Sequence, residues 1–230
     1  MYEKYFKRLF DLCIGVTVLL LLSWLFLILT VLGIVFMRGN PFFTQKRPGK
    51  GEKIFSLIKF RTMDNRKDKD GNLLPDEERL NGYGKLLRRL SFDELPEIIN
   101  IIAGDMSFVG PRPLLVRDMV FMTPEQRERH TVAQGLTGLA QVNGRNCIDW
   151  ETKLQYDLRY LGRITFAGDM KIVFKTLVKV LRSEDINTEG MATAEDFGDY
   201  LLREGKITSS FYEEKQEEAK ALLKAAEVRV

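Results

Sequence analysis

The sequence predicts a mainly helical α+β fold with an N-terminal re-entrant membrane helix and one small β-hairpin. The first observation is an uncharged and almost entirely apolar run from Leu12 to Met37. The second is a pair of short segments, 41–46 and 53–61, joined by a turn of sequence Pro-Gly-Lys-Gly. The third is a set of amphipathic helical patterns rich in basic residues, at 80–90 and 169–182.

The apolar run is long enough, as a helix, to cross the hydrocarbon core of a membrane. As a helix of about 26 residues it extends ~39 Å, which exceeds the ~30 Å hydrocarbon core of a bilayer. Basic residues flank both of its ends, and the positive-inside rule then places both ends in the cytoplasm. We therefore expect a re-entrant membrane helix over residues 1–37 that turns near Ser23. A simple spanning helix is the alternative.

The two segments after the membrane region predict a hairpin. In the second segment Lys59 and Arg61 share one face with Phe55 and Leu57, because side chains alternate along a strand. Lys59 and Arg61 either point at a common anion or are solvated charges of an edge strand. The charged residues 64–78 that follow contain Asp-Gly-Asn and predict a surface loop.

Two further helices carry basic residues beside an apolar stripe. In the first, Leu80, Tyr83, Leu87 and Leu90 align on one face with three basic residues nearby. The second runs from 169 to 182 with lysines on one side and large apolar residues around the rest. Both patterns are typical of helices that lie at a lipid interface.

The segment 90–113 contains a pair of adjacent acids at the expected start of a helix. Ser91 and Glu94 have the spacing of a capping box, which predicts a helix from Phe92 with Asp93 and Glu94 in its first turn. The buried stripe of this helix is predicted to consist of Leu95, Ile98, Ile99 and Ile102. Carboxylates and bound anions are both favoured at this position of a helix. The acids are therefore either helix caps or functional groups, and Pro96 should fix the geometry of their turn.

The remaining chain offers weaker signals. A polar helix is expected over 123–134, and its His130, the single histidine, should be solvated. Two turn clusters, 135–138 and 143–146, either bring backbone N–H groups and Arg145 near a phosphate or are ordinary turns. A last helix should begin at Phe211 behind a second capping box, with an apolar seam sufficient for docking or for homo-oligomer formation.

The charge distribution divides the chain into unequal parts. Residues 38–70 contain ten basic and four acidic residues, whereas residues 184–230 contain six basic and twelve acidic residues. A basic region after an apolar segment suits membrane lipids or a phosphate-rich substrate, and no nucleic-acid motif is present. The two cysteines form neither a disulfide framework nor a zinc site. We expect a membrane helix over 1–37, a cytosolic catalytic domain over 38–195 and an acidic helical extension over 196–230.

Five motifs occur together and in order, and through them the chain resembles a known family. They are KRLFD (7–11), FTQKRPG (43–49), KFRTM (59–63), LSFDELPEIINIIAGDMSFVGPRP (90–113) and GLTGLAQVNGRN (135–146). The family is that of the bacterial sugar transferases, the monotopic phosphoglycosyl transferases. The resemblance covers about residues 1–195. It is strongest to the small members that place diacetylbacillosamine phosphate on undecaprenyl phosphate.

This resemblance implies a re-entrant helix with both ends cytoplasmic, a Mg²⁺ ion, and amphipathic interfacial helices around a cytosolic active site at the bacterial inner membrane. It implies transfer of a sugar 1-phosphate from a UDP-sugar to undecaprenyl phosphate, with UMP as the other product. Asp93 matches the nucleophile and would contact the metal, and Glu94 would assist it. Phosphate oxygens would be held by Lys59, Arg88, Arg112 and Arg145.

One departure from the family pattern concerns the membrane helix. Small members usually break this helix with Ser-Pro, whereas this chain has Ser23-Trp24. Two other functions stay open on the residues alone. One is a membrane-tethered scaffold whose acidic extension recruits other enzymes, and the other is a magnesium-dependent pyrophosphatase that uses the same acids.

Overall fold

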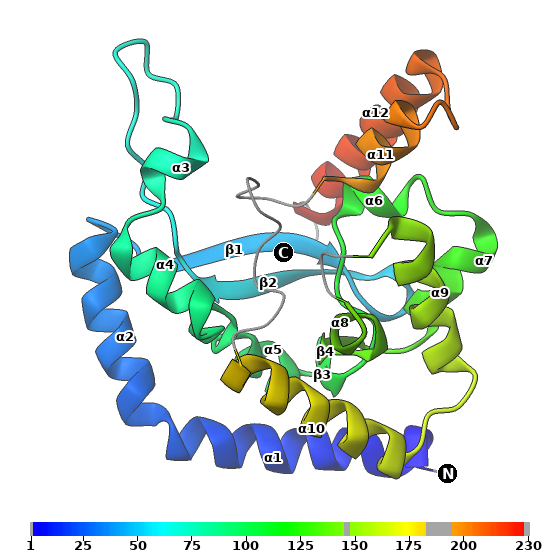
Figure 1. Ribbon diagram of the computed structural model, residues 1–230, viewed down its shortest axis with the longest axis horizontal. Helices are drawn as coiled ribbons and strands as arrows, with labels where there is room; N and C mark the ends of the chain where they lie inside the picture. Colours follow the sequence, from blue (N-terminus) through cyan, green and yellow to red (C-terminus); the bar gives the residue numbers. More distant parts are fainter. Residues whose placement is uncertain (1, 145–147, 183–194, 228–230) are drawn as a thin grey trace.

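The structure is an α+β fold dominated by helices, as the sequence predicts (Figure 1). This computed structural model describes residues 2–144, 148–182 and 195–227. Its strands are β1 (Phe42–Pro48), β2 (Ile54–Phe60), β3 (Met106–Val109) and β4 (Gln134–Thr137). Its α-helices are α1 (Lys7–Leu21), α2 (Ser23–Phe36), α3 (Asp76–Arg79), α4 (Gly82–Arg89), α5 (Glu97–Ala103), α6 (Val116–Met119), α7 (Pro124–Arg127), α8 (Leu139–Val142), α9 (Trp150–Leu161), α10 (Phe166–Arg182), α11 (Phe197–Arg203) and α12 (Ser209–Glu227).

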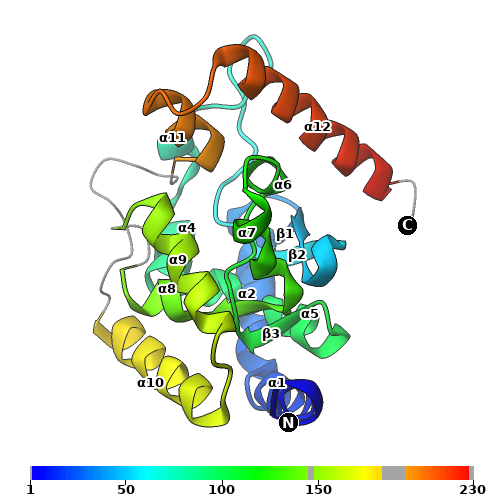
Figure 2. The same ribbon diagram turned by 90° about the vertical axis from the view of Figure 1, so that its right-hand side faces the viewer.

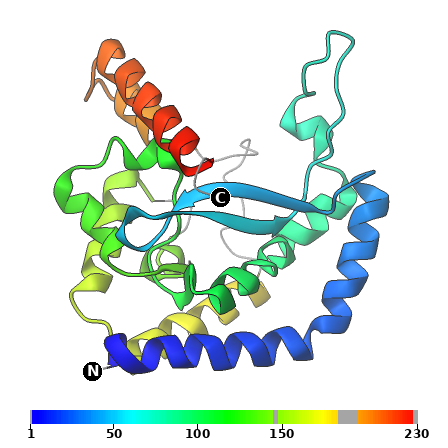
Figure 3. The same ribbon diagram turned by 180° about the vertical axis from the view of Figure 1, so that it is seen from behind.

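The apolar N-terminal segment forms two helices, α1 and α2, that meet at a bend of 65°. No single helix of the described chain is long and apolar enough to cross a membrane, while this bent pair passes on length and composition together. α1 runs along the base of the molecule and α2 rises along one side (Figure 3). The break falls next to Ser23, where the sequence predicts it. There Ser23 Oγ donates a hydrogen bond to the carbonyl of Leu20 at 2.9 Å.

Charged residues of α1 fasten this helix to the rest of the molecule. Lys7 Nζ lies 2.5 Å from Asp169 Oδ2 on α10, and both side chains are buried. Arg8 Nη2 donates to the carbonyl of Ile102 in α5 at 2.7 Å. Asp11 Oδ1 accepts the backbone N–H of a β3 residue at 3.0 Å. The polar side of α1 therefore faces the protein, which leaves its apolar side exposed.

α2 is held separately, against α4 and the hairpin. Tyr83 OH donates to the carbonyl of Leu29 at 2.7 Å, and Asn81 Nδ2 donates to the carbonyl of Phe36 at 3.1 Å. Leu29 also packs in a cluster with Phe60 of β2. The bend between α1 and α2 is consequently supported by tertiary contacts on both sides.

The predicted hairpin is confirmed. β1 and β2 pair antiparallel, with Phe43 opposite Lys59 and Pro48 opposite Ile54. On the face that carries Lys59, Leu57 is buried against Ile101 of α5. The hairpin crosses the middle of the molecule (Figure 1). Near the end of β2, Lys59 Nζ lies 2.9 Å from Glu94 Oε1, in the segment that contains the acids.

A second, parallel sheet was not predicted. β3 pairs with β4, although the sequence of β4 predicts a turn at 135–138. The glycines that suggest a turn serve close packing instead. A Cβ atom on Gly135 would lie 2.1 Å from the backbone nitrogen of Gly110, and one on Gly138 would lie 2.1 Å from the Gly110 carbonyl oxygen. Only glycine permits this approach of two backbones.

The expected polar helix over 123–134 is shorter than predicted, and its histidine is not solvated. Thr123 caps α7 through a hydrogen bond from Gln126 N at 3.2 Å, and a 3-10 helix over Glu128–Thr131 follows. His130 is only 1% exposed, and burial together with the charge of Arg129 lowers its pKa to about 4. Arg129 and Gln134 are buried as well, whereas Glu128 and Thr131 are exposed, so polar character in this segment does not report solvent exposure.

The C-terminal segment docks on the core formed by α6 and α9. α12 begins at Ser209, two residues before the predicted Phe211. Its apolar seam packs, as predicted, against a core that includes Phe121, Trp150 and Phe197. Figure 2 shows α11 and α12 at the end of the molecule opposite α1 and α10.

Candidate active site

The turn that carries the acids precedes a helix instead of beginning it. Ser91 has a left-handed backbone conformation, with φ of 54°, and its side chain caps nothing, so the predicted capping box is wrong. Asp93 and Glu94 lie in a single 3-10 turn, Phe92–Glu94. A left-handed serine carries strain of order 1 kcal/mol, which the surrounding contacts must offset.

Helix α5 starts at Glu97 because Pro96 has no N–H to enter the helical hydrogen-bond pattern. The later start also changes the buried face. Ile98 and Ile101 are buried, whereas Ile99, a member of the predicted stripe, is 38% exposed.

Glu94 is held by two cations. Its Oε1 accepts hydrogen bonds from Lys59 Nζ at 2.9 Å and from Arg112 Nη2 at 2.6 Å. Burial alone would raise the pKa of Glu94, but the neighbouring Arg112 and Lys59 cations hold it well below its usual range. Glu94 in turn raises the pKa of Arg112. The structure therefore brings together three of the residues that the sequence predicts for this site.

Asp93 has no such partner. No hydrogen bond or ion pair joins its side chain to another residue in the described part of the chain. Burial and the adjacent Glu94 charge raise the pKa of Asp93 to about 6, despite the opposing charges of Lys59, Arg112 and Arg88. Asp93 is thus ionised at neutral pH, yet it is more basic than an exposed aspartate.

A third carboxylate, Glu97, was missed by the sequence analysis. Its Oε1 lies 3.1 Å from Lys59 Nζ, so one ammonium group bridges Glu97 and Glu94. The Glu97 side chain is only 3% exposed, and burial raises its pKa to about 7. Its spacing could have indicated Glu97 as a site residue, because it lies about one helical turn after Asp93 and Glu94.

The remaining two predicted cations are placed differently. Arg88 Nε donates to Thr62 Oγ1 at 3.1 Å, and its charge acts on the pKa of Asp93. Arg88 therefore belongs to the same site. Arg145 lies outside the described residues.

The acids do not form a ready-made metal cage. Among the described residues no group of three or more His, Cys, Asp or Glu side chains is arranged to hold a metal ion. Mg²⁺ is commonly bound by one or two carboxylates together with substrate phosphates. The unpaired Asp93 carboxylate fits that role, so a metal here would share its ligands between protein and substrate.

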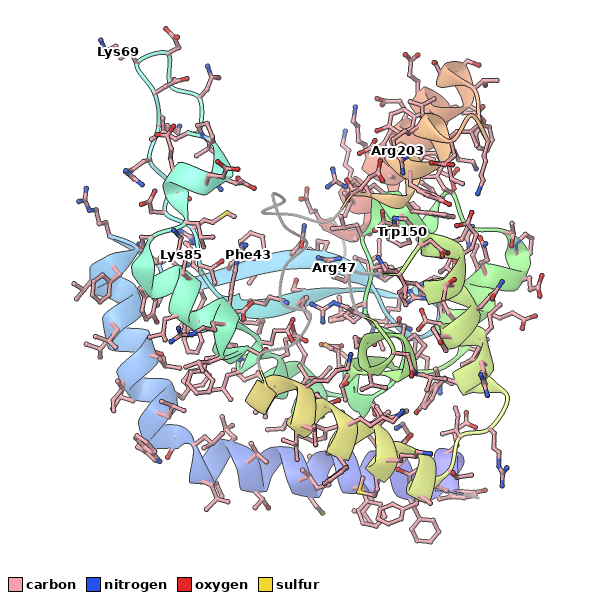
Figure 4. All side chains as sticks on the ribbon, in the orientation of Figure 1. Phe43, Arg47, Lys69, Lys85, Trp150 and Arg203 are labelled. Carbon is pink, nitrogen blue, oxygen red and sulfur yellow. The ribbon has the colours of Figure 1, made fainter. Side chains whose placement is uncertain are left out.

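The surfaces near α1 and α2 are apolar and basic. On α10, Phe174 and Leu177 are 68% and 57% exposed, and lysines border them in the same helix. A hollow on α4 is lined by Gly82, Lys85, Leu86 and Arg89, and Figure 4 shows the position of Lys85 on this helix. Such surfaces are typical of helices that contact lipid.

Comparisons with known proteins show the family of the chain. Residues 2–183 match the family described as bacterial sugar transferase. An uncharacterized sugar transferase, EpsL, of Bacillus subtilis is 48% identical over 193 residues, which cover 83% of this chain and 95% of the relative. The undecaprenyl-phosphate galactose phosphotransferase of Salmonella typhimurium is 33% identical over 202 residues, 79% of this chain and 42% of the relative. The UDP-glucose:undecaprenyl-phosphate glucose-1-phosphate transferase of Xanthomonas campestris is 34% identical over 194 residues, 78% of this chain and 40% of the relative.

Proposed function

The chain belongs to the bacterial sugar transferase family, and from this membership we propose that it transfers a sugar 1-phosphate from a UDP-sugar to undecaprenyl phosphate. The products would be undecaprenyl diphosphate-sugar and UMP. Two relatives whose names state transfer to undecaprenyl phosphate support this substrate class. The reaction would be the first membrane step of a glycan assembly.

The single observation that supports the mechanism is that two adjacent acids have different environments. Glu94 is bound by Lys59 and Arg112, whereas Asp93 makes no hydrogen bond or ion pair to another described residue and has a pKa of about 6. A raised pKa makes the ionised carboxylate a better nucleophile, while a value of about 6 still leaves it ionised at neutral pH. Asp93 is therefore the acid suited to attack.

In the first step an Asp93 carboxylate oxygen attacks the sugar-bearing phosphorus of the UDP-sugar. The bond from this phosphorus to the bridging oxygen breaks, UMP leaves with the bonding electrons, and a sugar-phosphoryl group remains on Asp93. In the second step an oxygen of undecaprenyl phosphate attacks the same phosphorus. The bond to Asp93 breaks, which releases the diphosphate product and restores the carboxylate.

The cations around Glu94 can neutralise the pyrophosphate. The side chain of Arg112 is 43% exposed, so it can turn from Glu94 toward a phosphate oxygen. Lys59 would stay near Glu97 when its contact with Glu94 is broken. Bound Mg²⁺ would supply further charge neutralisation and polarise the phosphoryl group, with Asp93 as its protein contact.

We further propose that the bent pair α1–α2 enters the inner membrane from the cytoplasmic side and returns to it. Support comes from the polar contacts of Lys7, Arg8 and Asp11, which tie the start of α1 to the domain that carries the acids. The exposed apolar side chains on α1, α2 and α10 support it as well. This arrangement would place the acids close to a lipid-borne acceptor.

The proposal is tested with Asp93→Asn, using Glu94→Gln as the neighbouring control. With Mg²⁺ and a panel of UDP-sugars, Asp93→Asn should reduce UMP release by about 10³-fold or more and form no labelled sugar-phosphoryl enzyme. Glu94→Gln should still form that species, more slowly. Retention of UMP release by Asp93→Asn would show that this residue is not the nucleophile.

Radiolabelled undecaprenyl phosphate separates the transferase from a pyrophosphatase. A transferase forms labelled lipid diphosphate-sugar in amounts equal to UMP when acceptor is present. A pyrophosphatase continues to release UMP and free sugar phosphate without any acceptor. Continuous acceptor-independent turnover would therefore overturn the proposed function while keeping a role for the same acids.

A further inference from the structure

Each carbonyl oxygen of the Pro-Arg-Pro turn at 111–113 accepts a hydrogen bond from a different part of the chain. Gly135 N–H, in β4, donates to the first of these carbonyls at 2.8 Å. Arg129 Nη2 donates to the carbonyl of Arg112 at 2.5 Å. Arg47 Nη1, in β1, donates to the third carbonyl at 3.2 Å. The backbone on both sides of Arg112 is thus fixed from three elements.

Arg129 is built into the interior. It is 0% exposed, and its Nε and Nη2 lie 2.9 and 2.8 Å from Asp157 Oδ2 on α9. Its Nη1 lies 3.3 Å from Nε2 of His130. His130 Nδ1 lies 3.2 Å from the carbonyl of Arg127. These contacts assign a neutral imidazole that donates through Nδ1 and accepts through Nε2, so the whole cluster orients the Arg129 guanidinium.

Arg47, which is half-buried, supplies the second guanidinium at this turn. Its Nη2 donates to Gln45 Oε1 at 2.7 Å, which directs Nη1 toward the turn. Burial and the nearby charge of Arg112 lower the pKa of Arg47 to about 10, so it is still charged at neutral pH. Figure 4 shows Arg47 near the middle of the molecule. It belongs to the FTQKRPG motif, for which the proposed mechanism has no other use.

We propose that Arg47 and Arg129 are positioning residues that aim the Arg112 side chain at the phosphoryl site through the carbonyls of its turn. This inference rests on the proposed function. Prolines on both sides already restrict the backbone dihedrals of Arg112. Hydrogen bonds to the carbonyls remove most of the remaining freedom, so the direction of the Arg112 Cα–Cβ bond is set before substrate binds.

Direct binding of phosphate by Arg129 is the competing role, and its surroundings argue against it. Its contacts to Asp157, His130 and the Arg112 carbonyl already engage three of its nitrogen atoms. A residue without solvent exposure would have to break these contacts to reach a substrate. Arg112, which is half-exposed, needs no such rearrangement.

A double-mutant cycle tests the proposal. Arg129→Gln and Arg47→Gln are each made alone and together with Arg112→Ala, and kcat/KM for UMP formation is measured per mole of folded protein. Each single variant should lose about tenfold or more, since a small misplacement of a charged group has a large effect on rate. In the Arg112→Ala background the same changes should cost less than about twofold, because the side chain that they position is absent.

Arg127→Gln is the matched control. Arg127 lies in the same segment and forms an ion pair with Glu52, and among the described residues no hydrogen bond or ion pair joins its side chain to the Pro-Arg-Pro turn. This variant should keep its activity per folded molecule. Arg129→Lys keeps the charge but has one donor nitrogen in place of three. It provides a second variant if Arg129→Gln does not fold, and it should be more active than Arg129→Gln.

The stability and affinity readouts separate the possible failures. Arg129→Gln should lower the Tm equally in the wild-type and Arg112→Ala backgrounds. The backbone carbonyl of residue 112, to which Arg129 donates, is present in both. The same variants are also compared by their affinity for UDP. This comparison tests the positioning role even if Asp93 proves not to be the nucleophile. Multiplicative losses in both kcat/KM and UDP affinity would overturn the positioning role. A chain that neither binds UDP nor releases UMP overturns this inference together with the proposed function.

Discussion

Replacing Glu94 with glutamine should move the acid limb of the pH–rate profile. The Glu94 charge is one of the two causes that raise the pKa of Asp93 to about 6, the other being burial. Below its pKa Asp93 is protonated and cannot attack, so activity falls as the pH falls through about 6. Without the Glu94 charge, Lys59 and Arg112 are also free to act on Asp93. Both effects lower its pKa toward the ordinary value of about 3.9.

The magnitude follows from the ionised fraction. Burial, the larger cause, is unchanged in Glu94→Gln, so the pKa of Asp93 falls only part of the way. At pH 5 a carboxyl group of pKa about 6 is roughly one-tenth ionised, whereas one of pKa about 5 is roughly half ionised. Relative to its own plateau near neutral pH, the wild-type chain should therefore keep about a tenth of its kcat/KM at pH 5, and Glu94→Gln should keep several times that fraction. The plateau itself should be lower in the variant, because the contacts that orient Lys59 and Arg112 are weakened.

The assay is UMP release between about pH 4.5 and 8 at constant Mg²⁺, because kcat/KM reports the ionisation of the free enzyme. Glu97→Gln is the control. It also removes a buried carboxylate bound to Lys59, but its charge is not among the main influences on the pKa of Asp93. Equal acid limbs in the wild type and Glu94→Gln would refute the electrostatic coupling between the paired acids. A shift of the acid limb of the same size in Glu97→Gln would show that the loss of any nearby negative charge is enough to move it.

Three further changes test the fold and its placement. Cysteine labels at Tyr2 and Asn40 should both be protected from an impermeant reagent added outside the cell, and labelling of Tyr2 alone would establish a spanning helix. Lys7→Met leaves the buried Asp169 carboxylate without its cation and should lower the free energy of unfolding by about 3–5 kcal/mol in a denaturant titration. Lys171→Met, on the helix that carries Asp169, should lower it little. Phe197→Ala removes a 2% exposed side chain from the core under the C-terminal helices and should cost about 3–5 kcal/mol, and an unchanged Tm would mean that these helices do not contribute to the core.

Elements whose signal is local were predicted well. The hairpin depends on alternation and a Pro-Gly turn, and α10 and α12 depend on apolar periodicity within one helix. The break at Ser23 was predicted from the basic residues on both sides of the apolar run. For the hairpin and these two helices the information lies within about twenty adjacent residues, and for the break it lies in the apolar run and its immediate flanks.

Elements whose signal is tertiary were missed. The spacing of Ser91 and Glu94 satisfies the capping-box pattern, but Glu94 is bound by Lys59 and Arg112, which no local pattern contains. The glycines of β4 resemble a turn because the sequence does not show that Gly135 approaches the backbone of Gly110. His130 is buried by the Arg129 cluster for the same reason. Glu97 was overlooked because its role appears only when Lys59 from the hairpin is placed between two acids.

The pair Ser23-Trp24 shows how the bend can persist without a proline. Ser23 binds the carbonyl of Leu20, while Trp24 is 61% exposed and makes no hydrogen bond to another described residue. A serine bond of this kind can bend a helix but does not by itself fix an angle. The angle is instead set by the two ends of the pair, through the contact of Lys7 with Asp169 on α10 and through the contact of Tyr83 with α2.

The same contacts link the position of α1 to the acids of the candidate site. Arg8 binds the C-terminal end of α5, whose N-terminal end follows directly from the turn of Asp93 and Glu94. Asp11 binds β3, and β3 leads directly into the turn of Arg112. Because α1 contacts both α5 and β3, the turn of Asp93 and Glu94 and the turn of Arg112 have a common reference in that helix. A change that tilts α1 should therefore displace both turns together. Under the proposed function, the distance from Asp93 to the lipid-borne phosphate would then change before the geometry of the acids does.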